Sequence, residues 1–280
     1  MSTPRPSVAD KRRRFHQLHT SGCFVIPNPW DLGSARMLQG LGFEALASTS
    51  SGFAWSQGHP DNGLSRDAVL QHLADLVAAT DVPVNADFEN GFGDSPAAVA
   101  DSVRLAVATG VAGLSIEDST GDAAAPLFAL DDAVARLRAA RAAIDTAGGD
   151  VLLVGRAECF LVGQPDIDAT ITRLQAYAAA GADVLYAPGI QQPEHIRAVV
   201  AAVAPKPVNL LVGSPSPMTV ADIAALGVRR ISVGGALARS AWAGFQRAAQ
   251  SLADGRFDGF TGAASGAGLN GFFGPDAERR

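Results

Sequence analysis

The sequence repeats one pattern eight times: a short apolar segment followed by a stretch with helical periodicity. The apolar segments cover residues 23–28, 45–50, 82–89, 113–119, 151–158, 183–189, 207–213 and 229–235. Strands that alternate with helices join through right-handed crossovers into a parallel sheet. Eight such units in a chain of 280 residues predict an α/β fold, and fit an eight-stranded parallel β/α (TIM-type) barrel better than an open doubly wound sheet.

The repeats also indicate how the chain is organised. "GLGFEALAS", "ATGVAGLSI", "AAGADVLYA" and "ALGVRRISV" each read as helix, glycine turn and strand, and no linker separates them. We therefore expect one barrel domain over residues 1–280. It would begin with a helix at about residues 7–20 and end in a Gly-rich tail at about 256–280 that is partly loose or packed on a neighbouring subunit.

Composition excludes several classes of protein. A net charge of -6 argues against a nucleic-acid partner, and the one basic cluster, residues 11–14, reads as the solvated face of a helix. Cys23 and Cys159 form no metal or disulfide pattern. Without a signal-peptide pattern or an apolar run of roughly 18 residues, we expect a cytoplasmic protein with no membrane partner.

Polar side chains gather where the predicted strands end, whereas the strand starts are apolar or routine. In a β/α barrel the carboxyl ends of the strands carry the chemistry. Asn85, Asp87 and Glu89 alternate along one predicted strand, which would place all three on one face. The polar residues at the other strand ends are Asn28, Trp30, Asp31, Ser50, Ser51, Gly52, Glu117, Asp118, Arg156, Glu158 and Asn209.

A cluster of acids at one barrel mouth requires a counter-charge. Two carboxylates roughly 6 Å apart repel each other by about 3 kcal/mol at an effective dielectric constant near 20. Arg156 alone cannot offset three or four of them, whereas a divalent cation can. Oxygen ligands without His or Cys at useful spacing favour Mg²⁺ (or Mn²⁺) over zinc, so we predict such an ion beside Asp87 and Glu89.

Several linked motifs resemble the isocitrate lyase/phosphoenolpyruvate mutase superfamily. They are "NPWDLGSARMLQGLGFEALASTSSGFAWSQGHPD", "VNADFENGFG", "GLSIEDS" and "VGRAE", within a similarity that runs from about residue 24 to residue 235. The resemblance implies a Mg²⁺-dependent barrel that cleaves or forms C–C or P–C bonds next to a 2-oxo acid, through an enolate-like intermediate. It also implies a homotetramer that exchanges terminal helices, for which residues 237–254 are suitable.

The resemblance assigns roles to individual positions. Asp87 matches a direct metal ligand, and the acids that hold metal-bound waters are matched by Asp61, Glu89 and Glu117. Backbone N–H groups of Ser51, Gly52 and Phe53 match a binding site for the substrate carboxylate. Arg156 matches an arginine that faces developing negative charge, Asn209 faces the substrate and Trp30 forms a pocket wall. The catalytic candidates are therefore Arg156, Glu117 and Asp61.

One departure from the superfamily narrows the expected activity. Its lyases carry a Lys-Lys-Cys-Gly-His type segment after the position of Glu117, where this chain has "STGDAAAPLFAL". Isocitrate lyase activity is therefore not expected, and His59 and Asp122 are the remaining, speculative, candidates for proton transfer. We predict a Mg²⁺-dependent lyase that cleaves a C–C bond, by retro-aldol cleavage or decarboxylation, of a small 2-oxo or 2-hydroxy dicarboxylate. The alternatives are a phosphoenolpyruvate or phosphonopyruvate mutase or hydrolase, and a non-catalytic 2-oxo acid binding protein.

Overall fold

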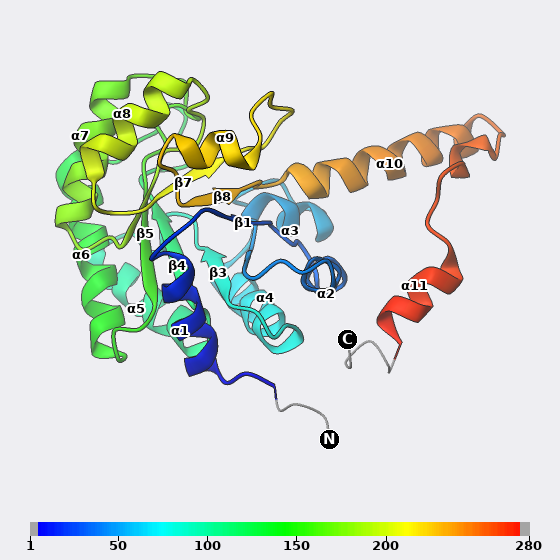
Figure 1. The fold of residues 1–280 in the computed structure, drawn as a ribbon, viewed down its shortest axis with the longest axis horizontal. Helices are drawn as coiled ribbons and strands as arrows, with labels where there is room; N and C mark the ends of the chain where they lie inside the picture. The colour runs from blue at the N-terminus through cyan, green and yellow to red at the C-terminus, as the bar shows by residue number, and fades with distance from the viewer. Residues whose placement is uncertain (1–4, 275–280) are drawn as a thin grey trace.

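The computed structural model describes residues 5–274 and shows a parallel sheet curled into a barrel and covered by helices (Figure 1). Eight strands pair in the order β1-β8-β7-β6-β5-β4-β3-β2, which confirms the predicted β/α barrel. The strands are β1 (Phe24–Ile26), β2 (Leu46–Ala47), β3 (Val84–Asp87), β4 (Gly113–Glu117), β5 (Leu152–Arg156), β6 (Val184–Tyr186), β7 (Val208–Leu211) and β8 (Arg230–Ser232).

The barrel is almost closed where β1 and β2, the two ends of the strand order, meet. β1 and β2 do not form a regular ladder, but the N–H of Ala47 donates to the carbonyl of Pro27 at 3.0 Å. The amide of Asn28 donates to the carbonyl of Ser48 at 2.9 Å and accepts from the N–H groups of Val233 and Gly234. One side chain therefore connects three chain segments at the barrel mouth.

Each observed strand is shorter than its predicted segment, and the difference matters most at β3. This strand ends at Asp87, and Glu89 follows in a turn with φ 47°, a conformation that side-chain-bearing residues seldom adopt. Asn85 and Asp87 share the inward face as expected, but Glu89 reaches the site through this turn. The prediction of one strand through residue 89 is wrong because the chain reverses at Asn90 and Gly91, where φ is 90° at the glycine.

The helices between the strands cover the outside of the barrel, and most of the helices begin with a side-chain cap. They are α1 (Val8–Leu18), α2 (Leu32–Gly40), α3 (Ser50–Ser56), α4 (Arg66–Ala79), α5 (Pro96–Ala108), α6 (Leu130–Thr146), α7 (Ile167–Ala179), α8 (Pro193–Val203), α9 (Val220–Ala225), α10 (Ala236–Ala253) and α11 (Gly266–Phe273). Ser95 caps α5 as predicted by accepting from the N–H of Ala98. The predicted N-terminal helix corresponds to α1.

The position of α1 decides which end of the barrel is open. Phe15 on α1 is fully buried in a cluster with Ile26 of β1 and with Ala45, Ala112 and Leu152, which lie at or just before the starts of β2, β4 and β5. The main apolar core lies between the sheet and the outer helices. The amino end of the barrel is thereby covered by a helix, and the carboxyl end remains available for a site.

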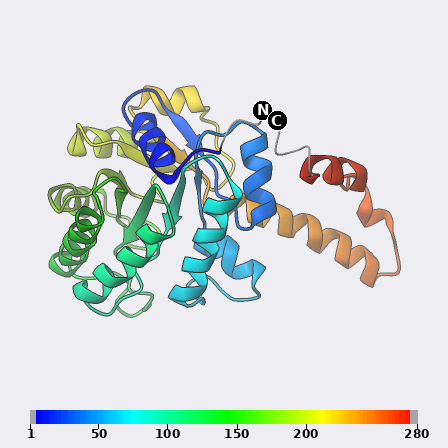
Figure 2. The same ribbon diagram turned by 90° about the horizontal axis from the view of Figure 1, so that it is seen from below.

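The C-terminal helices form an arm that leaves the barrel. α10 extends away from it, and α11 turns back beyond the 3₁₀ turn Asp258–Phe260 (Figures 1 and 2). Phe272 on α11 lies against Gly40 of α2, so this part of the predicted tail contacts its own chain. Trp242 and Phe245 on α10 remain 37% and 62% exposed. The predicted tetramer with exchanged helices stays a prediction, and residues 275–280 of the predicted tail lie outside the described residues.

Over residues 5–274, none of the helices is both long enough and apolar enough to cross a membrane.

Candidate active site

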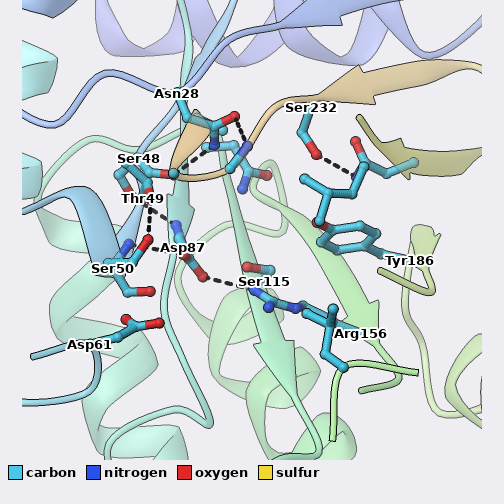
Figure 3. A pocket seen from close by; sticks show the side chains of 18 of the residues that line it. Asn28, Ser48, Thr49, Ser50, Asp61, Asp87, Ser115, Arg156, Tyr186 and Ser232 are labelled. Carbon is cyan, nitrogen blue, oxygen red and sulfur yellow. Dashed lines mark hydrogen bonds and ion pairs between the residues drawn. The ribbon is translucent and has the colours of Figure 1, made fainter. Parts of the chain in front are cut away.

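A cavity of about 180 Å³ opens at the carboxyl end of the barrel (Figure 3). Of the predicted site residues, Ser51, Asp61, Asp87, Arg156 and Asn209 line it. The rest of its wall comes from the inward faces of the strands and from the loops after them: Asn28, Ala47, Ser48, Thr49, Ser50, Asn85, Ser115, Leu161, Tyr186, Leu211, Arg230, Ser232, Gly234 and Gly235.

Asp87 is held at the end of β3 by its neighbours on β2 and α3. Its backbone N–H donates to the hydroxyl of Ser48 at 2.8 Å, and its Oδ2 accepts from the N–H of Ser50 at 3.0 Å. Its Oδ1 lies 3.3 Å from Nη1 of Arg156. These contacts fix the carboxylate so that it faces the cavity, as Figure 3 shows.

Arg156 is shared among three carboxylates. Its Nη1 lies 3.1 Å from Glu117 Oε2 as well as near Asp87, and its Nε pairs with Glu158. The guanidinium group also lies 5.2 Å from the ring centroid of Tyr186. Because this one positive charge is distributed over three partners, the site keeps an excess of negative charge.

The four predicted acids share one electrostatic environment although they come from separate segments. Burial, followed by the charges of Asp87 and Asp61, raises the pKa of Glu89 to about 8. Burial raises the pKa of Glu117. The positive charge of Arg156 opposes this rise, and the charges of Glu158, Asp87 and Glu89 add to it. Burial and the charge of Asp87 also raise the pKa of Asp61. Besides burial, the charges of neighbouring carboxylates raise these pKa values, which indicates that the acids lie close enough to repel one another.

The chemistry of this cluster fits a hard divalent cation. All its donors are oxygens, which Mg²⁺ and Mn²⁺ prefer, and its charge exceeds what Arg156 supplies. In the part of the chain that the structure describes, no three His, Cys, Asp or Glu side chains form a preassembled metal-binding group. Asp87 and Asp61 line the cavity, whereas Glu89 and Glu117 are not among its lining residues.

The serine-rich turn after β2 begins the short helix α3. The hydroxyl of Thr49 accepts from the N–H of Gly52 at 3.3 Å, and the carbonyl of Thr49 accepts from the N–H of Phe53 at 3.1 Å. The ring of Phe53 stacks on His72 with centroids 3.8 Å apart, away from the cavity. The helix itself therefore uses two of the three backbone groups predicted to bind a carboxylate, and Ser51 is the member that lines the cavity.

Other predicted residues lie around the site rather than in it. Trp30 does not line the cavity and packs behind Gly52. Asp31 caps α2 by accepting from the N–H of Ser34 at 2.6 Å. The loop at residues 119–127 is an exposed turn, in which Asp122 accepts from the N–H of Ala124. His59 is exposed and is not among the residues that line the cavity.

Asp118 supports the site from the protein interior. Its carboxylate accepts from the N–H of Glu158 at 2.8 Å, from Nη1 of Arg173 at 3.0 Å and from the hydroxyl of Tyr177 at 2.5 Å. Asp118 therefore orients Glu158, which in turn holds Arg156. This strand-end acid has a structural role, whereas its neighbour Glu117 contacts Arg156 directly.

The sequence interpretation missed several polar residues inside the barrel, Ser115, Tyr186, Arg230 and Ser232 among them. Tyr186 on β6 and Arg230 on β8 both line the cavity. Arg230 is 3% exposed, so the expectation of an apolar or routine strand start is wrong there. The signal that could have found it is the period of two that places Arg230 on the same face as Ser232.

The comparisons with known proteins agree with this geometry. The family model described as phosphoenolpyruvate phosphomutase matches residues 15–253. The chain belongs to the phosphoenolpyruvate mutase family. An oxaloacetate decarboxylase from Paraburkholderia xenovorans is 32% identical over 230 residues, which cover 79% of this chain and 74% of that protein.

Solved structures of family relatives superpose closely. A candidate lyase/mutase from Burkholderia cenocepacia has a TM-score of 0.92 and 50% identity, covering 96% of this chain and 98% of that one. Oxaloacetate acetylhydrolase bound to its product oxalate has a TM-score of 0.82 and 27% identity, covering 99% and 94%. Phosphonopyruvate hydrolase bound to oxalate and Mg²⁺ has a TM-score of 0.84 and 25% identity, covering 96% of both chains. The relatives are lyases, hydrolases and mutases, so membership in this family supports an enzymatic role.

Proposed function

We propose that this protein is a Mg²⁺-dependent lyase that cleaves a C–C bond of a small 2-oxo or 2-hydroxy dicarboxylate, by retro-aldol cleavage or decarboxylation. The observation that carries the proposal is the acid cluster around Arg156 in a cavity at the carboxyl end of the barrel. The oxaloacetate decarboxylase and oxaloacetate acetylhydrolase relatives support a carboxylic-acid substrate.

The acid cluster would hold the cation. Asp87, with Asp61, Glu89 and Glu117 around it, supplies the oxygen donors. Burial first, and then the charges of neighbouring carboxylates, raise the pKa values of the last three. A bound Mg²⁺ ion would stabilise, as a Lewis acid, the negative charge that develops on the 2-oxo group. The Mg²⁺ complex of phosphonopyruvate hydrolase supports this choice of ion.

Arg156 and the serine turn would orient the substrate. The guanidinium group is fixed by Asp87, Glu117 and Glu158, so its position does not depend on the substrate. A preorganised positive group stabilises a developing enolate without reorganising during the reaction. On the other side of the cavity, the hydroxyl of Ser51 lies 3.1 Å from that of Thr49 and can take part in binding the substrate carboxylate.

Tyr186 is suited to donate a proton to the enolate. It lines the cavity, and burial raises the pKa of its hydroxyl to about 12, so the group stays protonated at neutral pH. A neutral donor inside the cavity would take the place of the Lys, Cys and His residues that this chain lacks at positions 119–130. Proton delivery by Tyr186 is part of the proposal.

A substrate panel tests the proposed function. The purified protein is incubated with Mg²⁺ and oxaloacetate, methylisocitrate, isocitrate or phosphonopyruvate, and the release of pyruvate or glyoxylate is measured. We expect Mg²⁺-dependent turnover of oxaloacetate or methylisocitrate and no turnover of isocitrate. Asp87→Asn serves as the matched inactive control. Binding of these acids without any turnover would contradict the proposal.

Cleavage or rearrangement of a P–C bond is the second candidate. Phosphonopyruvate hydrolase shares the fold over 96% of both chains, and the matching family model is named after the phosphomutase. This candidate would be favoured if the protein converts phosphonopyruvate to phosphate and pyruvate, or to phosphoenolpyruvate, while oxaloacetate, methylisocitrate and isocitrate do not react.

A further inference from the structure

Arg230 is a buried charge that the proposed reaction does not use. It begins β8, is 3% exposed, and lines the same cavity as Asp87 and Arg156. Its strand position, before Ser232 on the same inward face, places it deeper in the barrel than the strand-end residues of the mouth. The cavity lining therefore contains two arginines at different depths.

The partners of these two arginines differ. Arg156 contacts three carboxylates, whereas Arg230 donates from Nε to Asn209 Oδ1 at 2.8 Å and from Nη1 to Asn85 Oδ1 at 3.3 Å. Within residues 5–274, Arg230 forms no salt bridge. Burial lowers its pKa to about 10, and only the Tyr186 phenol opposes this effect. Its positive charge is thus held by neutral amides alone.

The two amides are themselves oriented toward the guanidinium group. Asn209 donates from Nδ2 to the hydroxyl of Ser232 at 2.9 Å, and Asn85 donates from Nδ2 to the carbonyl of Ala86 at 3.0 Å. Each amide oxygen is therefore left to accept from Arg230. An unpaired buried charge lowers the stability of the fold, and a packed apolar residue would be the more stable choice if Arg230 had only a structural role.

We propose that Arg230 is an anion subsite that binds the far carboxylate of the substrate and so makes the enzyme specific for dicarboxylates over monocarboxylates. This inference rests on the proposed function, which places the 2-oxo acid end of the substrate at the acid cluster and Arg156. The carboxylates there repel a second anionic group. Arg156 is paired with three of them, so Arg230 is the one positive charge of the cavity lining that no carboxylate of the described chain neutralises.

Two acids that differ at the far end test the subsite. Oxaloacetate and 2-oxobutyrate share the 2-oxo acid group and the four-carbon length, but only oxaloacetate has a far carboxylate. In the presence of Mg²⁺, KM for oxaloacetate and the inhibition constant of 2-oxobutyrate give the preference of the intact protein for the dicarboxylate. A charge-assisted contact predicts a preference of roughly 10-fold to 100-fold, which Arg230→Met should reduce to about one. Arg230→Lys should retain part of it.

Arg12→Met is the matched control. Nε, Nη1 and Nη2 of Arg12 are all bonded, to Val111, Asp150 and Val107, at the covered end of the barrel. We expect this variant to melt at a lower temperature with an unchanged preference, whereas Arg230→Met melts at the same or a higher temperature than the parent protein.

The outcomes separate the two proposals. If the parent protein uses oxaloacetate and Arg230→Met keeps the preference for it, the subsite is wrong and the proposed function stands. If Arg230→Met unfolds and Arg230→Lys also discriminates like the parent protein, Arg230 has only a structural role. If the parent protein binds neither acid, the subsite proposal fails, and turnover of methylisocitrate in the substrate panel then decides whether the proposed function stands.

Discussion

Replacing Glu89 with glutamine isolates the contribution of one charge to the acid cluster. Burial, Asp87 and Asp61 raise the pKa of Glu89 from an ordinary 4.5 to about 8. The folded protein therefore binds this proton more tightly than the unfolded chain does. The resulting stability is fully present below about pH 4.5, decreases as the pH rises, and is lost above about pH 8.

The magnitude follows from this shift. One pKa unit corresponds to about 1.4 kcal/mol, so the Glu89 carboxyl lowers the free energy of unfolding by roughly 3 kcal/mol at pH 7 and by roughly 1 kcal/mol at pH 5. Glutamine has nearly the same size and cannot ionise. We expect Glu89→Gln to raise the free energy of unfolding of the metal-free protein by roughly 2–3 kcal/mol at pH 7 and by less than about 1 kcal/mol at pH 5.

Urea unfolding in EDTA, followed by tryptophan fluorescence at pH 5, 6, 7 and 8, measures this difference. Glu44→Gln is the control, because Glu44 pairs with Arg14 on the surface and its side chain is 53% exposed. Removing an exposed charge of this kind changes stability by about 0.5 kcal/mol or less. If Glu89→Gln and the parent protein unfold at the same urea concentration at pH 7, or if their difference does not grow with pH, the electrostatic reasoning about the cluster is refuted.

Four further predictions concern the site and the arm. Asp87→Asn should reduce Mg²⁺-dependent turnover by more than roughly 100-fold while the melting temperature holds, because it removes one charge from a repulsive cluster; a large loss of stability would make Asp87 structural. Tyr186→Phe should lower kcat and leave KM nearly unchanged, and an unchanged kcat excludes it as the proton donor. Asp118→Asn should lower the free energy of unfolding by roughly 3 kcal/mol in urea titrations, because it leaves Arg173 without its carboxylate; no loss would mean that the network is dispensable. Sedimentation should show a tetramer that Phe245→Asp weakens, since Phe245 is 62% exposed on α10, and a monomeric parent protein would contradict the expected exchange of helices.

Much of the site could be predicted because a β/α barrel brings its strand ends together. The alternation of apolar strands and helices predicts the barrel, and the barrel brings Asp87, Glu117 and Arg156 to one end whatever lies between them in the sequence. The motifs of the superfamily added Asp61, which lies in a loop that strand patterns do not place.

The roles of individual side chains depended on contacts that sequence spacing does not specify. Phe53 follows Ser51 closely, yet its ring stacks on His72 while Ser51 lines the cavity. Glu117 and Asp118 are adjacent acids, yet one contacts Arg156 and the other is buried against Arg173 and Tyr177. Side chains at successive positions of a strand point to opposite faces, and residues two apart on a helix such as α3 also point in different directions. Distant segments of the chain determine which partner each side chain contacts.

The sequence by itself determined the barrel, the end of the barrel at which polar groups meet, and the oxygen-rich chemistry of that end. Only the tertiary structure decided how the positive charges are used, with Arg156 shared by three carboxylates and Arg230 held by two amides. The physical reason is that hydrophobic periodicity is local, whereas the free energy of a buried charge depends on every group that folding brings within a few ångströms of it.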